Sequence, residues 1–349
     1  YLGRTFEYEI IDEAQVIKNA KTQGAKAVKE ISANARFALT GTPVENRLSE
    51  LWSIFDFLMP GFLYSYRKFR ERYELPIVKN QDPEALTALR RMTGPFVLRR
   101  LKKDVLRELP TKEERIVYSA ASGRQQKLYT ASALKLKEAL AGGAWSGNGK
   151  LEVLSQLMRL RQICCDPALC FEDYTGESAK LETCVSLIAS ASAAGHKILL
   201  FSQFASMLER IRERLLQEGI SSHLLVGATP KEERSRMVQA FASDEVPVFL
   251  ISLKAGGTGL NLTAADIVIH YDPWWNVAAQ NQATDRAYRI GQEKPVTVYK
   301  LILKDTIEEN LLKLQNAKLA LAAQVVSEGM VSLGDLSQNE LMELFEQNP

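Results

Sequence analysis

The stretch Leu253–Gln292, LKAGGTGLNLTAADIVIHYDPWWNVAAQNQATDRAYRIGQ, combines a glycine-rich loop, a strand-like apolar run and a helix-like segment. If that segment is helical, Gln282, Arg286 and Arg289 fall at i, i+4 and i+7 and share one face. Guanidinium groups stay charged and bind two oxygens at once, which suits a transferring phosphoryl group. The stretch therefore predicts a phosphate-binding face. Surface ion pairs with neighbouring carboxylates are the alternative explanation of the two arginines.

The glycine-rich loop holds three glycines close together, Gly256, Gly257 and Gly259. Glycine allows positive φ angles and close approach of the backbone to a ligand. Because a plain tight turn needs only one such residue, this loop is predicted to contact a bound molecule, such as a nucleotide or a nucleic acid.

Two carboxylates follow a strand-like run near the other end of the chain. Phe6–Ile11 leans apolar and ends at Asp12 and Glu13, and open parallel sheets place their ligands at such a carboxyl edge. One carboxylate can hold hydrated Mg²⁺ while its neighbour orients or deprotonates a water molecule. Asp12 is predicted as the metal-binding group and Glu13 as the base. Taken alone, such a pair would be explained as a solvated turn.

Strands and helices alternate regularly beyond Lys180. Strands are predicted at Lys197–Phe201, Ser222–Val226, Val248–Ser252, Ile267–Tyr271 and Val296–Ile302, with helices between them. Residues 1–59 show the same alternation in shorter form, with strand-like runs at Phe6–Ile11 and Arg36–Leu39. Strands that alternate with helices form parallel sheets covered on both faces, so the chain is predicted to be an α/β protein.

An ordered series of motifs links the acidic pair to the stretch quoted first. It runs through Asp12–Gln15, Leu39–Pro43, Asn46, Leu51–Trp52, Arg99–Val105, Leu109–Pro110 and Ile198–Phe204. The series resembles the Swi/Snf-type family of helicase-like DNA translocases, whose members are built from two RecA-like lobes, and it covers nearly the whole chain. Two positions depart from the family pattern: Gln15 stands where many members carry His, and Glu45 stands where Gln is more usual.

The resemblance implies RecA-like parallel sheets with helices on both faces and helical protrusions. It implies a partial first lobe with a helical protrusion and a connector at residues 1–115, a helical second protrusion at 116–180, and a complete second lobe at 181–304. Residues 305–349 would form a brace helix, from Ile307 to about Val326, and an acidic tail. Helices of the two protrusions are expected at Tyr64–Arg91, Ser122–Ala141 and Leu151–Gln162.

The resemblance also assigns roles to individual residues. Catalysis would depend on Asp12, Glu13, Arg286 and Arg289, with Asp12 holding Mg²⁺. Nucleotide binding would involve Thr40, Gly257, Gly259 and Gln282, with Thr40 sensing the nucleotide state. DNA would be contacted by Ser202, Gln203, Lys254, Asn261 and Trp274. Alternatives stay open: a capped turn for Thr40, a strand-end turn for Ser202 and Gln203, and core packing for Trp274 with Trp275.

The sequence holds no Gly-x-x-x-x-Gly-Lys-Ser/Thr stretch, the loop whose backbone and lysine hold the phosphates of ATP. In the family this element precedes the acidic motif, and only eleven residues precede Asp12 in this chain. We therefore expect a fragment whose phosphate loop lies upstream of Tyr1. Negligible ATP hydrolysis is expected from the isolated chain.

Composition and charge agree with a globular protein of more than one domain. Of 349 residues, 46% are hydrophobic and 25% are charged, which is enough for two cores. Tyr66–Arg115 holds 14 Lys and Arg against 8 Asp and Glu, whereas Asp305–Pro349 holds 2 against 8. A basic middle attracts a polyanion such as DNA, although a solvated helical face is the other explanation.

Neither membrane insertion nor secretion is indicated by the sequence. It contains no run of about 18 uncharged apolar residues and no signal-peptide pattern. Cys164, Cys165, Cys170 and Cys184 fit no zinc spacing, so reduced thiols are expected. We expect a cytoplasmic location, at the nucleoid of a bacterium, or a nuclear one in a eukaryote.

The leading prediction is an ATP-dependent translocase on double-stranded DNA that uses ATP and Mg²⁺, remodels a DNA-bound protein target and acts as a monomer. One alternative is a non-catalytic module that binds DNA or a protein partner. Another is a strand-separating helicase or an RNA-stimulated ATPase. Stimulation by blunt duplex DNA, compared with single-stranded DNA and RNA, separates the leading prediction from the last one.

Overall fold

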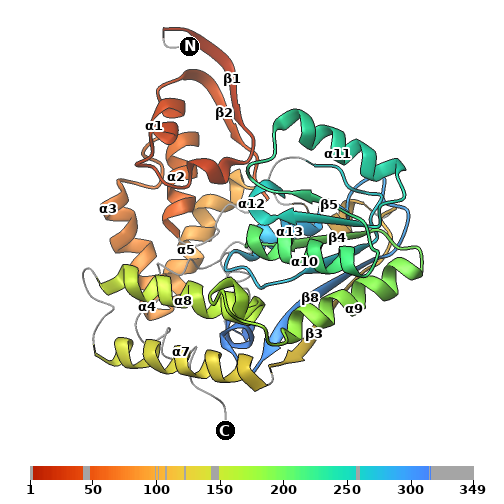
Figure 1. Cartoon of the computed structure of the whole chain (residues 1–349). Helices are drawn as coiled ribbons and strands as arrows, with labels where there is room; N and C mark the ends of the chain where they lie inside the picture. Colours follow the sequence, from red (N-terminus) through yellow and green to blue (C-terminus); the bar gives the residue numbers. More distant parts are fainter. Residues whose placement is uncertain are drawn as a thin grey trace. The chain divides into compact units, whose positions relative to one another are not determined.

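The computed structural model describes residues 3–41, 48–98, 100, 102–106, 108–121, 123–142, 149–256, 260–313 and 315. These residues form two compact units, the first within Tyr1–Leu101 and the second within Lys102–Leu314 (Figure 1). The first unit contains a two-stranded sheet and the second a six-stranded sheet. Both sheets are parallel and accompanied by helices, so the predicted α/β class is confirmed.

The first unit begins with a small parallel sheet and the segments that join its strands. These elements are β1 (Thr5–Ile11), the 3₁₀ turn η1 (Ala14–Ile17), α1 (Gln23–Lys29) and β2 (Ser32–Ala38). The strands pair from Thr5 opposite Ser32 to Ile11 opposite Ala38, so their carboxyl ends are level. Of the two strands predicted here, the first is confirmed and the second starts earlier than predicted, at Ser32.

Helices make up the rest of the first unit. They are α2 (Leu48–Leu58), α3 (Tyr66–Phe69), the π-helical turn η2 (Arg70–Glu74), α4 (Leu75–Asn80), α5 (Pro83–Thr93) and η3 (Gly94–Phe96). The start of α5 follows from local chemistry: Pro83 occupies its first turn, and the Asp82 carboxylate accepts hydrogen bonds from the Glu84 and Ala85 amides. The helical character predicted for residues 64–91 is confirmed.

The second unit is organised by a sheet in the order β3-β8-β7-β4-β6-β5, with every neighbouring pair parallel. Its strands are β3 (Lys112–Ala120), β4 (Ile198–Ser202), β5 (Ser222–Leu225), β6 (Val248–Ser252), β7 (Ile267–His270) and β8 (Val296–Lys304). All five strands predicted from the alternation are present, with ends that differ by two residues or fewer.

Strand β3 corrects the boundary expected between residues 115 and 116. The expectation assigns residues up to 115 to the first lobe and its connector and begins a helical protrusion at 116. Instead, Lys112–Ala120 forms one edge of the second sheet, and all nine residues pair with β8. Because β3 is an exposed edge strand with charged residues at its start, it lacks the apolar run that reveals the inner strands.

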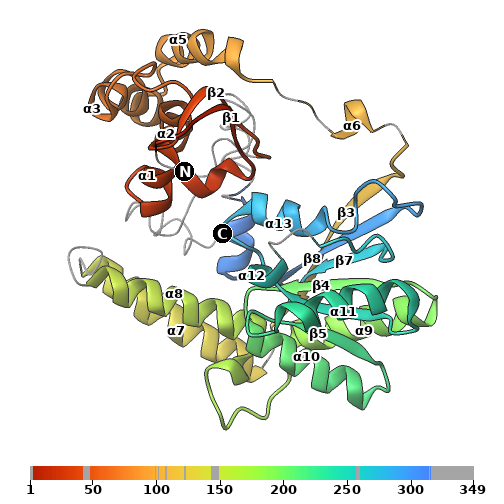
Figure 2. The same ribbon diagram turned by 90° about the horizontal axis from the view of Figure 1, so that it is seen from above.

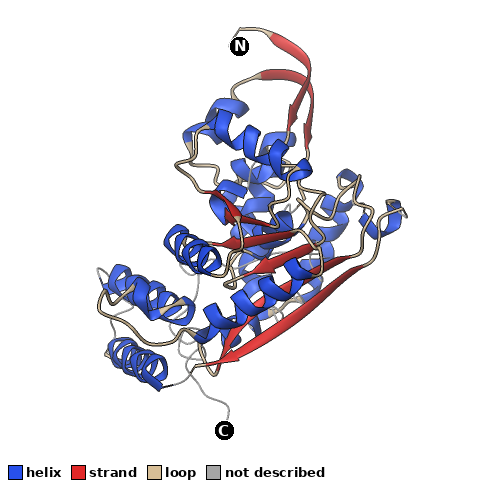
Figure 3. Cartoon of the chain, turned by 45° about the vertical axis from the view of Figure 1, so that its right-hand side comes forward, coloured by secondary structure: helices blue, strands red, loops and turns tan. Residues whose placement is uncertain are grey.

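Helices cover both faces of the larger sheet (Figure 3). One face carries α9 (Ala179–Ala193) and α10 (Ala205–Gln217), and the other carries α11 (Lys231–Ser243), α12 (Leu253–Gly256) and α13 (Val277–Thr284). In β4, Ile198 and Leu200 pack toward the first face, while Leu199 and Phe201 pack toward the second. Successive residues of a strand point to opposite faces, which is why β4 is an unbroken apolar run.

Two longer helices, α7 (Gly123–Ala141) and α8 (Gly149–Cys165), lie side by side in the second unit (Figure 2). They confirm the helices predicted for the second protrusion. Residues 307–313 are also helical, and the predicted brace helix beyond residue 315 lies outside the described residues. Within the described part of the chain, no helix is both long and apolar enough to cross a membrane.

Candidate functional site

The acidic pair lies at the carboxyl edge of the first sheet, directly after β1, as predicted. Asp12 and Glu13 are both exposed. The Asp12 carboxylate accepts a hydrogen bond from the Glu13 amide (2.8 Å), and Glu13 has left-handed backbone angles, φ 50° and ψ 52°. Such angles cost a residue other than glycine about 1–2 kcal/mol. Tyr64, Gln81 and Asp305 also have positive φ angles, so the conformation of Glu13 by itself assigns no role to its side chain.

Glu13 is connected to Thr40 through Gln15. The Gln15 carboxamide donates to the Glu13 carboxylate (2.5 Å) and accepts from the Thr40 hydroxyl (2.7 Å). Backbone hydrogen bonds of 2.8 and 2.9 Å hold together the segments that follow β1 and β2. The sequence predicts Glu13 and Thr40 as separate site residues, and the structure joins them at the position where this chain departs from the family pattern.

The chemistry of this edge fits a magnesium ion. Hydrated Mg²⁺ is held by one or two carboxylates together with water and phosphate oxygens. Asp12 offers such a carboxylate at an exposed edge, beside Glu13, so Asp12 is the residue that would hold the ion. In the described part of the chain no group of three or more His, Cys, Asp or Glu side chains could hold a metal ion.

The two predicted arginines lie in a turn rather than on the helix that their spacing predicts. Helix α13 ends at Thr284, and the amides of Arg286 and Ala287 bond three residues back instead of four. The prediction of one helical face shared by Gln282, Arg286 and Arg289 is therefore wrong beyond Gln282. The tighter turn accompanies the packing of Ala287 into the core under the sheet, a tertiary contact that helix periodicity does not report.

This arginine turn is attached to the segment after the glycine-rich loop. A guanidinium nitrogen of Arg289 donates to the Leu260 carbonyl (3.3 Å), and the Arg286 carbonyl accepts from the Leu262 amide (3.0 Å). Arg286 is only 8% exposed, and Arg289 is partly exposed. The structure thus brings both arginines beside the end of the predicted loop, although by contacts other than a shared helical face.

Gln292 holds the arginine turn in place, a role that sequence reasoning missed. Its carboxamide nitrogen lies within hydrogen-bond distance of the carbonyls of Thr263 (3.1 Å), Ala265 (2.8 Å) and Ala287 (3.2 Å). Its oxygen accepts from the Lys294 amide (2.9 Å). A single uncharged polar residue in a turn has no periodicity, so its burial at 6% exposure is the first signal of this role.

A second attachment to the arginine turn comes from helix α6 (Lys102–Val105). The Lys102 ammonium pairs with the Asp285 carboxylate (2.7 Å) and donates to the Tyr288 carbonyl (3.4 Å). Asp285, a carboxylate next to Arg286 in sequence, therefore has a lysine partner. Both side chains are about two-fifths exposed, so the pair adds little stability and mainly fixes where α6 meets the turn.

Ser202 and Gln203 lie at the carboxyl end of β4, next to the end of β7. Ser202 is fully buried, and its hydroxyl donates to the Asp272 carboxylate (2.5 Å). The Gln203 carboxamide oxygen accepts from the Arg161 guanidinium (2.9 Å). Both side chains are thus turned into the protein, and their role in contacting DNA stays a prediction. Arg161 and Asp272 are buried partners of these two residues that the sequence did not reveal.

The other predicted DNA contacts differ in exposure. Lys254 and Asn261 are exposed, and Trp274 is partly exposed. Lys254 follows the carboxyl end of β6, and Trp274 follows that of β7, so both lie toward the same edge of the sheet as Ser202. The predicted loop residues Gly257 and Gly259 lie outside the described residues.

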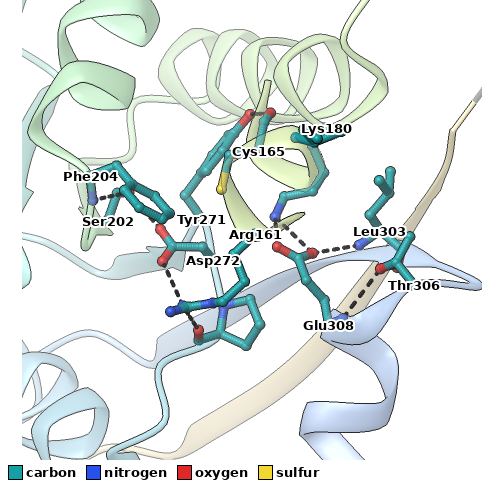
Figure 4. Close-up of polar contacts among 12 residues, drawn as sticks. Arg161, Cys165, Lys180, Ser202, Phe204, Tyr271, Asp272, Leu303, Thr306 and Glu308 are labelled. Carbon is teal, nitrogen blue, oxygen red and sulfur yellow. Dashed lines mark hydrogen bonds and ion pairs between the residues drawn. The ribbon is translucent and has the colours of Figure 1, made fainter. Parts of the chain in front are cut away.

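Two buried ion pairs lie behind this edge (Figure 4). Arg161 faces Asp272, and burial raises the pKa of Asp272 while the guanidinium opposes that rise. The Lys180 ammonium contacts both oxygens of Glu308 (2.7 and 2.9 Å). Burial lowers the pKa of Lys180, but the Glu308 carboxylate outweighs it and raises that pKa above its ordinary value. Each pair places a basic group beside an acidic one.

Comparisons with known proteins match both units. The SNF2-related domain matches residues 3–169, and the helicase conserved C-terminal domain matches residues 179–291. The structure of a SWI2/SNF2 ATPase core from Sulfolobus solfataricus in complex with double-stranded DNA is 37% identical, with a TM-score of 0.58. That likeness covers 98% of this chain and 73% of the archaeal one.

Curated relatives are longer than this chain. The uncharacterized ATP-dependent helicase MG018 of Mycoplasma genitalium is 41% identical over 98% of this chain and 33% of its own length. Human TATA-binding protein-associated factor 172 is 36% identical over 97% of this chain and 22% of its own length. The chain thus spans about a third of the bacterial relative and less of the human one. With its motifs, two parallel sheets and these likenesses, the chain belongs to the SWI2/SNF2 (SNF2-related) family of ATP-dependent helicase-like proteins.

Proposed function

We propose that the protein is an ATP-dependent translocase that moves along double-stranded DNA and remodels protein bound to it. The proposal rests above all on Glu13, an exposed carboxylate held in a left-handed conformation at a strand edge and linked through Gln15 to Thr40. The archaeal relative bound to duplex DNA supports double-stranded DNA as the nucleic acid along which the protein moves. The relative named for its association with TATA-binding protein supports a DNA-bound protein target.

In this proposal Glu13 orients the attacking water and accepts its proton. Asp12 would hold Mg²⁺, which neutralises charge on the phosphate oxygens when bound. Thr40 detects the state of the nucleotide, because a movement of the Glu13 carboxylate passes through the two hydrogen bonds of Gln15 to the Thr40 hydroxyl. This chain of contacts connects the hydrolytic carboxylate to the end of the neighbouring strand.

Arg286 and Arg289 stabilise the charge of the transferring phosphoryl group. Their turn is bonded to the segment after the glycine-rich loop and is held by Gln292, so the guanidinium groups need little reorganisation during the reaction. An arginine in this role accelerates phosphoryl transfer by about a thousandfold or more. Gln282, which remains on α13, and the loop residues Gly257 and Gly259 complete the proposed nucleotide contacts.

DNA is held mainly through its backbone. Lys254 and Asn261 are exposed and suited to phosphodiester oxygens, and Trp274 is partly exposed near the same edge. Backbone contacts carry no sequence information, so opening and closing of two lobes would step along any duplex. The first unit acts as the first lobe and the second unit as the second, in a monomer at the bacterial nucleoid or in the nucleus.

An ATPase assay tests the proposal in a form of the protein that carries a phosphate loop. Blunt duplex DNA should stimulate turnover more than single-stranded DNA or RNA does. Arg289→Ala should lower turnover by about a thousandfold, whereas Arg212→Ala, an exposed arginine of α10, should not. Preferential stimulation by single strands would favour a strand-separating helicase, and normal turnover of Arg289→Ala would remove that arginine from the mechanism.

The non-catalytic binding module remains the second candidate, because the 349 residues contain no phosphate-loop motif. We expect this chain by itself to bind duplex DNA and to hydrolyse ATP negligibly, since no lysine-bearing loop holds the β- and γ-phosphates. Strong duplex-stimulated turnover by these residues alone would contradict that expectation. Absence of turnover in the form with a phosphate loop would favour the binding module for the whole protein.

A further inference from the structure

Arg161 is a fully buried cation in helix α8, at 1% exposure. Its closest charged partner, Asp272, follows β7 and is also fully buried (Figure 4). The carboxylate nevertheless lies 3.5 Å from the nearest guanidinium nitrogen, which is longer than the hydrogen bonds of an ordinary two-pronged arginine–carboxylate pair. Asp272 thus supplies the opposite charge without taking the directed hydrogen bonds of Arg161.

Those directed bonds go to two separate segments of the second unit. One terminal nitrogen donates to the side-chain oxygen of Gln203, after β4 (2.9 Å), and the other donates to the carbonyl of Pro273, after β7 (2.6 Å). The partners lie 42 and 112 residues further along the chain. Because the guanidinium is planar and its donors are fixed in direction, it sets the spacing of the two segments.

The aromatic residues of these segments surround the same guanidinium. Its carbon lies 5.3 Å from the Trp275 ring, 6.0 Å from the Trp274 ring and 5.8 Å from the Phe204 ring. Aromatic rings at such distances attract a cation through their electron-rich faces. Arg161 therefore contacts the side chains of both segments as well as their polar groups, including Trp274, which is one of the predicted DNA contacts.

Several buried polar atoms in this cluster have no hydrogen-bond partner among the described residues. They are Arg161 Nε, Gln203 Nε2, Asp272 Oδ2 and Trp275 Nε1. The neighbouring Lys180–Glu308 pair differs, because the ammonium contacts both carboxylate oxygens and one of these also accepts from the Leu303 amide (2.9 Å). Unsatisfied buried groups are destabilising, so the Arg161 cluster is arranged for geometry more than for stability.

The boundary between the two family matches falls between Arg161 and its partners. Arg161 falls in the match of the SNF2-related domain, residues 3–169, whereas Gln203, Asp272 and Pro273 fall in that of the helicase C-terminal domain, residues 179–291. Helix α8 lies outside the match of the helicase domain. Its Arg161 joins the ends of β4 and β7, which lie within that match.

We propose that Arg161 is a positioning residue for DNA engagement: it holds the segments after β4 and β7 at the spacing that binds one duplex backbone. The inference rests on the proposed function, since it concerns how the proposed DNA edge is shaped. Arg161 itself is buried and touches no DNA. It acts through Gln203 and through the Pro273–Trp275 segment.

Two substitutions and a matched control test this role. Arg161→Lys keeps a charge opposite Asp272 but cannot donate along two fixed directions at once. Arg161→Met removes the charge and the hydrogen-bond donors. Arg159→Lys is the control, because Arg159 is an exposed arginine of the same helix that lies over the Phe171 ring (5.0 Å). The measurements are the dissociation constant for a fluorescent blunt duplex, by anisotropy, and the thermal unfolding midpoint.

For Arg161→Lys we expect the dissociation constant for duplex to rise about tenfold, the effect of about one lost charge-assisted hydrogen bond, with an unfolding midpoint close to that of the wild type. In a form with a phosphate loop, the duplex concentration for half-maximal ATPase should rise while the KM for ATP stays unchanged. A purely structural role would lower the midpoint and the active fraction without moving the duplex constant, and that result would overturn the inference.

A double-mutant cycle tests whether Arg161 acts through Gln203. If Arg161 acts through Gln203, the effect of Arg161→Lys on duplex binding should shrink in a Gln203→Ala background. Fully additive effects would overturn this route, and wild-type affinity in Arg161→Lys would overturn the inference as a whole. Failure of the wild-type protein to bind any duplex is a separate result, which would end the proposed function and the inference with it.

Discussion

Two strand edges carry the candidate chemistry, and they are built in opposite ways. At the edge of β1 and β2, Asp12 and Glu13 are exposed, and their hydrogen bonds reach residues one or two positions away. At the edge of β4 and β7, Arg161 and Asp272 are buried, and the partners are separated by tens of residues along the chain. In the proposed function, the first edge offers reactive groups to a substrate, and the second sets the distances between segments.

The contrast separates two ways in which a residue can matter. Changes at the exposed edge should affect the reaction and leave folding almost untouched, because exposed side chains contribute little to stability. Changes in the buried clusters should affect stability or spacing, because a buried charge without its partner is strongly unfavourable. Substitutions at both places test whether this division holds.

The largest effect is expected at the exposed edge, from Glu13→Gln. Loss of the general base should reduce ATP turnover by about a thousandfold, measured in a form of the protein with a phosphate loop. Nucleotide affinity and the unfolding midpoint should stay near those of the wild type, since the amide keeps the size of the side chain. Substantial remaining turnover would show that Glu13 is not the base.

In the buried region, Lys180→Met should destabilise the second unit by about 3–5 kcal/mol, because Glu308 would be left buried without its partner. Urea unfolding followed by fluorescence measures the change. The double variant Lys180→Met/Glu308→Gln is the matched control, since it removes both charges and should recover much of the loss. Equal stability of the single and double variants would contradict a compensating ion pair.

An intermediate effect is expected at His270, a fully buried residue of β7. Its Nε2 lies 2.8 Å from the Thr284 hydroxyl, which itself donates to the Gln280 carbonyl, so Nε2 is the donor of this hydrogen bond. Burial, assisted by Lys300 and Lys112 and opposed by Glu114, lowers the pKa of His270 to about 3.

The sign of the pH effect follows from that lowered pKa. Below pH ~6.5 the unfolded chain takes up a proton at this position, whereas the folded protein does so only near pH 3, so stability falls as the pH drops between these values. The slope approaches about 1.4 kcal/mol per pH unit. His270→Gln should remove this contribution from urea midpoints measured at pH 7.5, 6 and 5. If stability falls with pH equally in the wild type and in His270→Gln, His270 does not cause the fall.

The smallest effect is expected from Thr40→Val, which removes the hydroxyl that donates to Gln15. One hydrogen bond is worth about 1 kcal/mol, or about fivefold in turnover. Thr40→Ser keeps the hydroxyl and should behave like the wild type in the same ATPase assay. If valine and serine variants are equal, the Gln15 connection has no part in coupling.

The features that the sequence predicted well are those set by local patterns. The inner strands were revealed by apolar runs that take turns with helical segments, because a strand buried on both faces is an unbroken apolar run. The acidic pair was placed at a strand edge because it directly follows Phe6–Ile11, which leans apolar. Strand β3 was missed because an exposed edge strand needs no apolar run, and the arginine turn was mistaken for helix because core packing of Ala287 overrides helical spacing.

By itself, the sequence determined the α/β class, the order of the motifs and the position of the acidic pair at a strand edge, since each depends on residues close together in the chain. Only the tertiary structure decided the partners of Arg161, the support that Gln292 gives to the arginine turn and the link from Glu13 to Thr40. Those contacts join residues that are mostly far apart in sequence, and a directed hydrogen bond between distant segments leaves no periodic pattern for sequence reasoning to read.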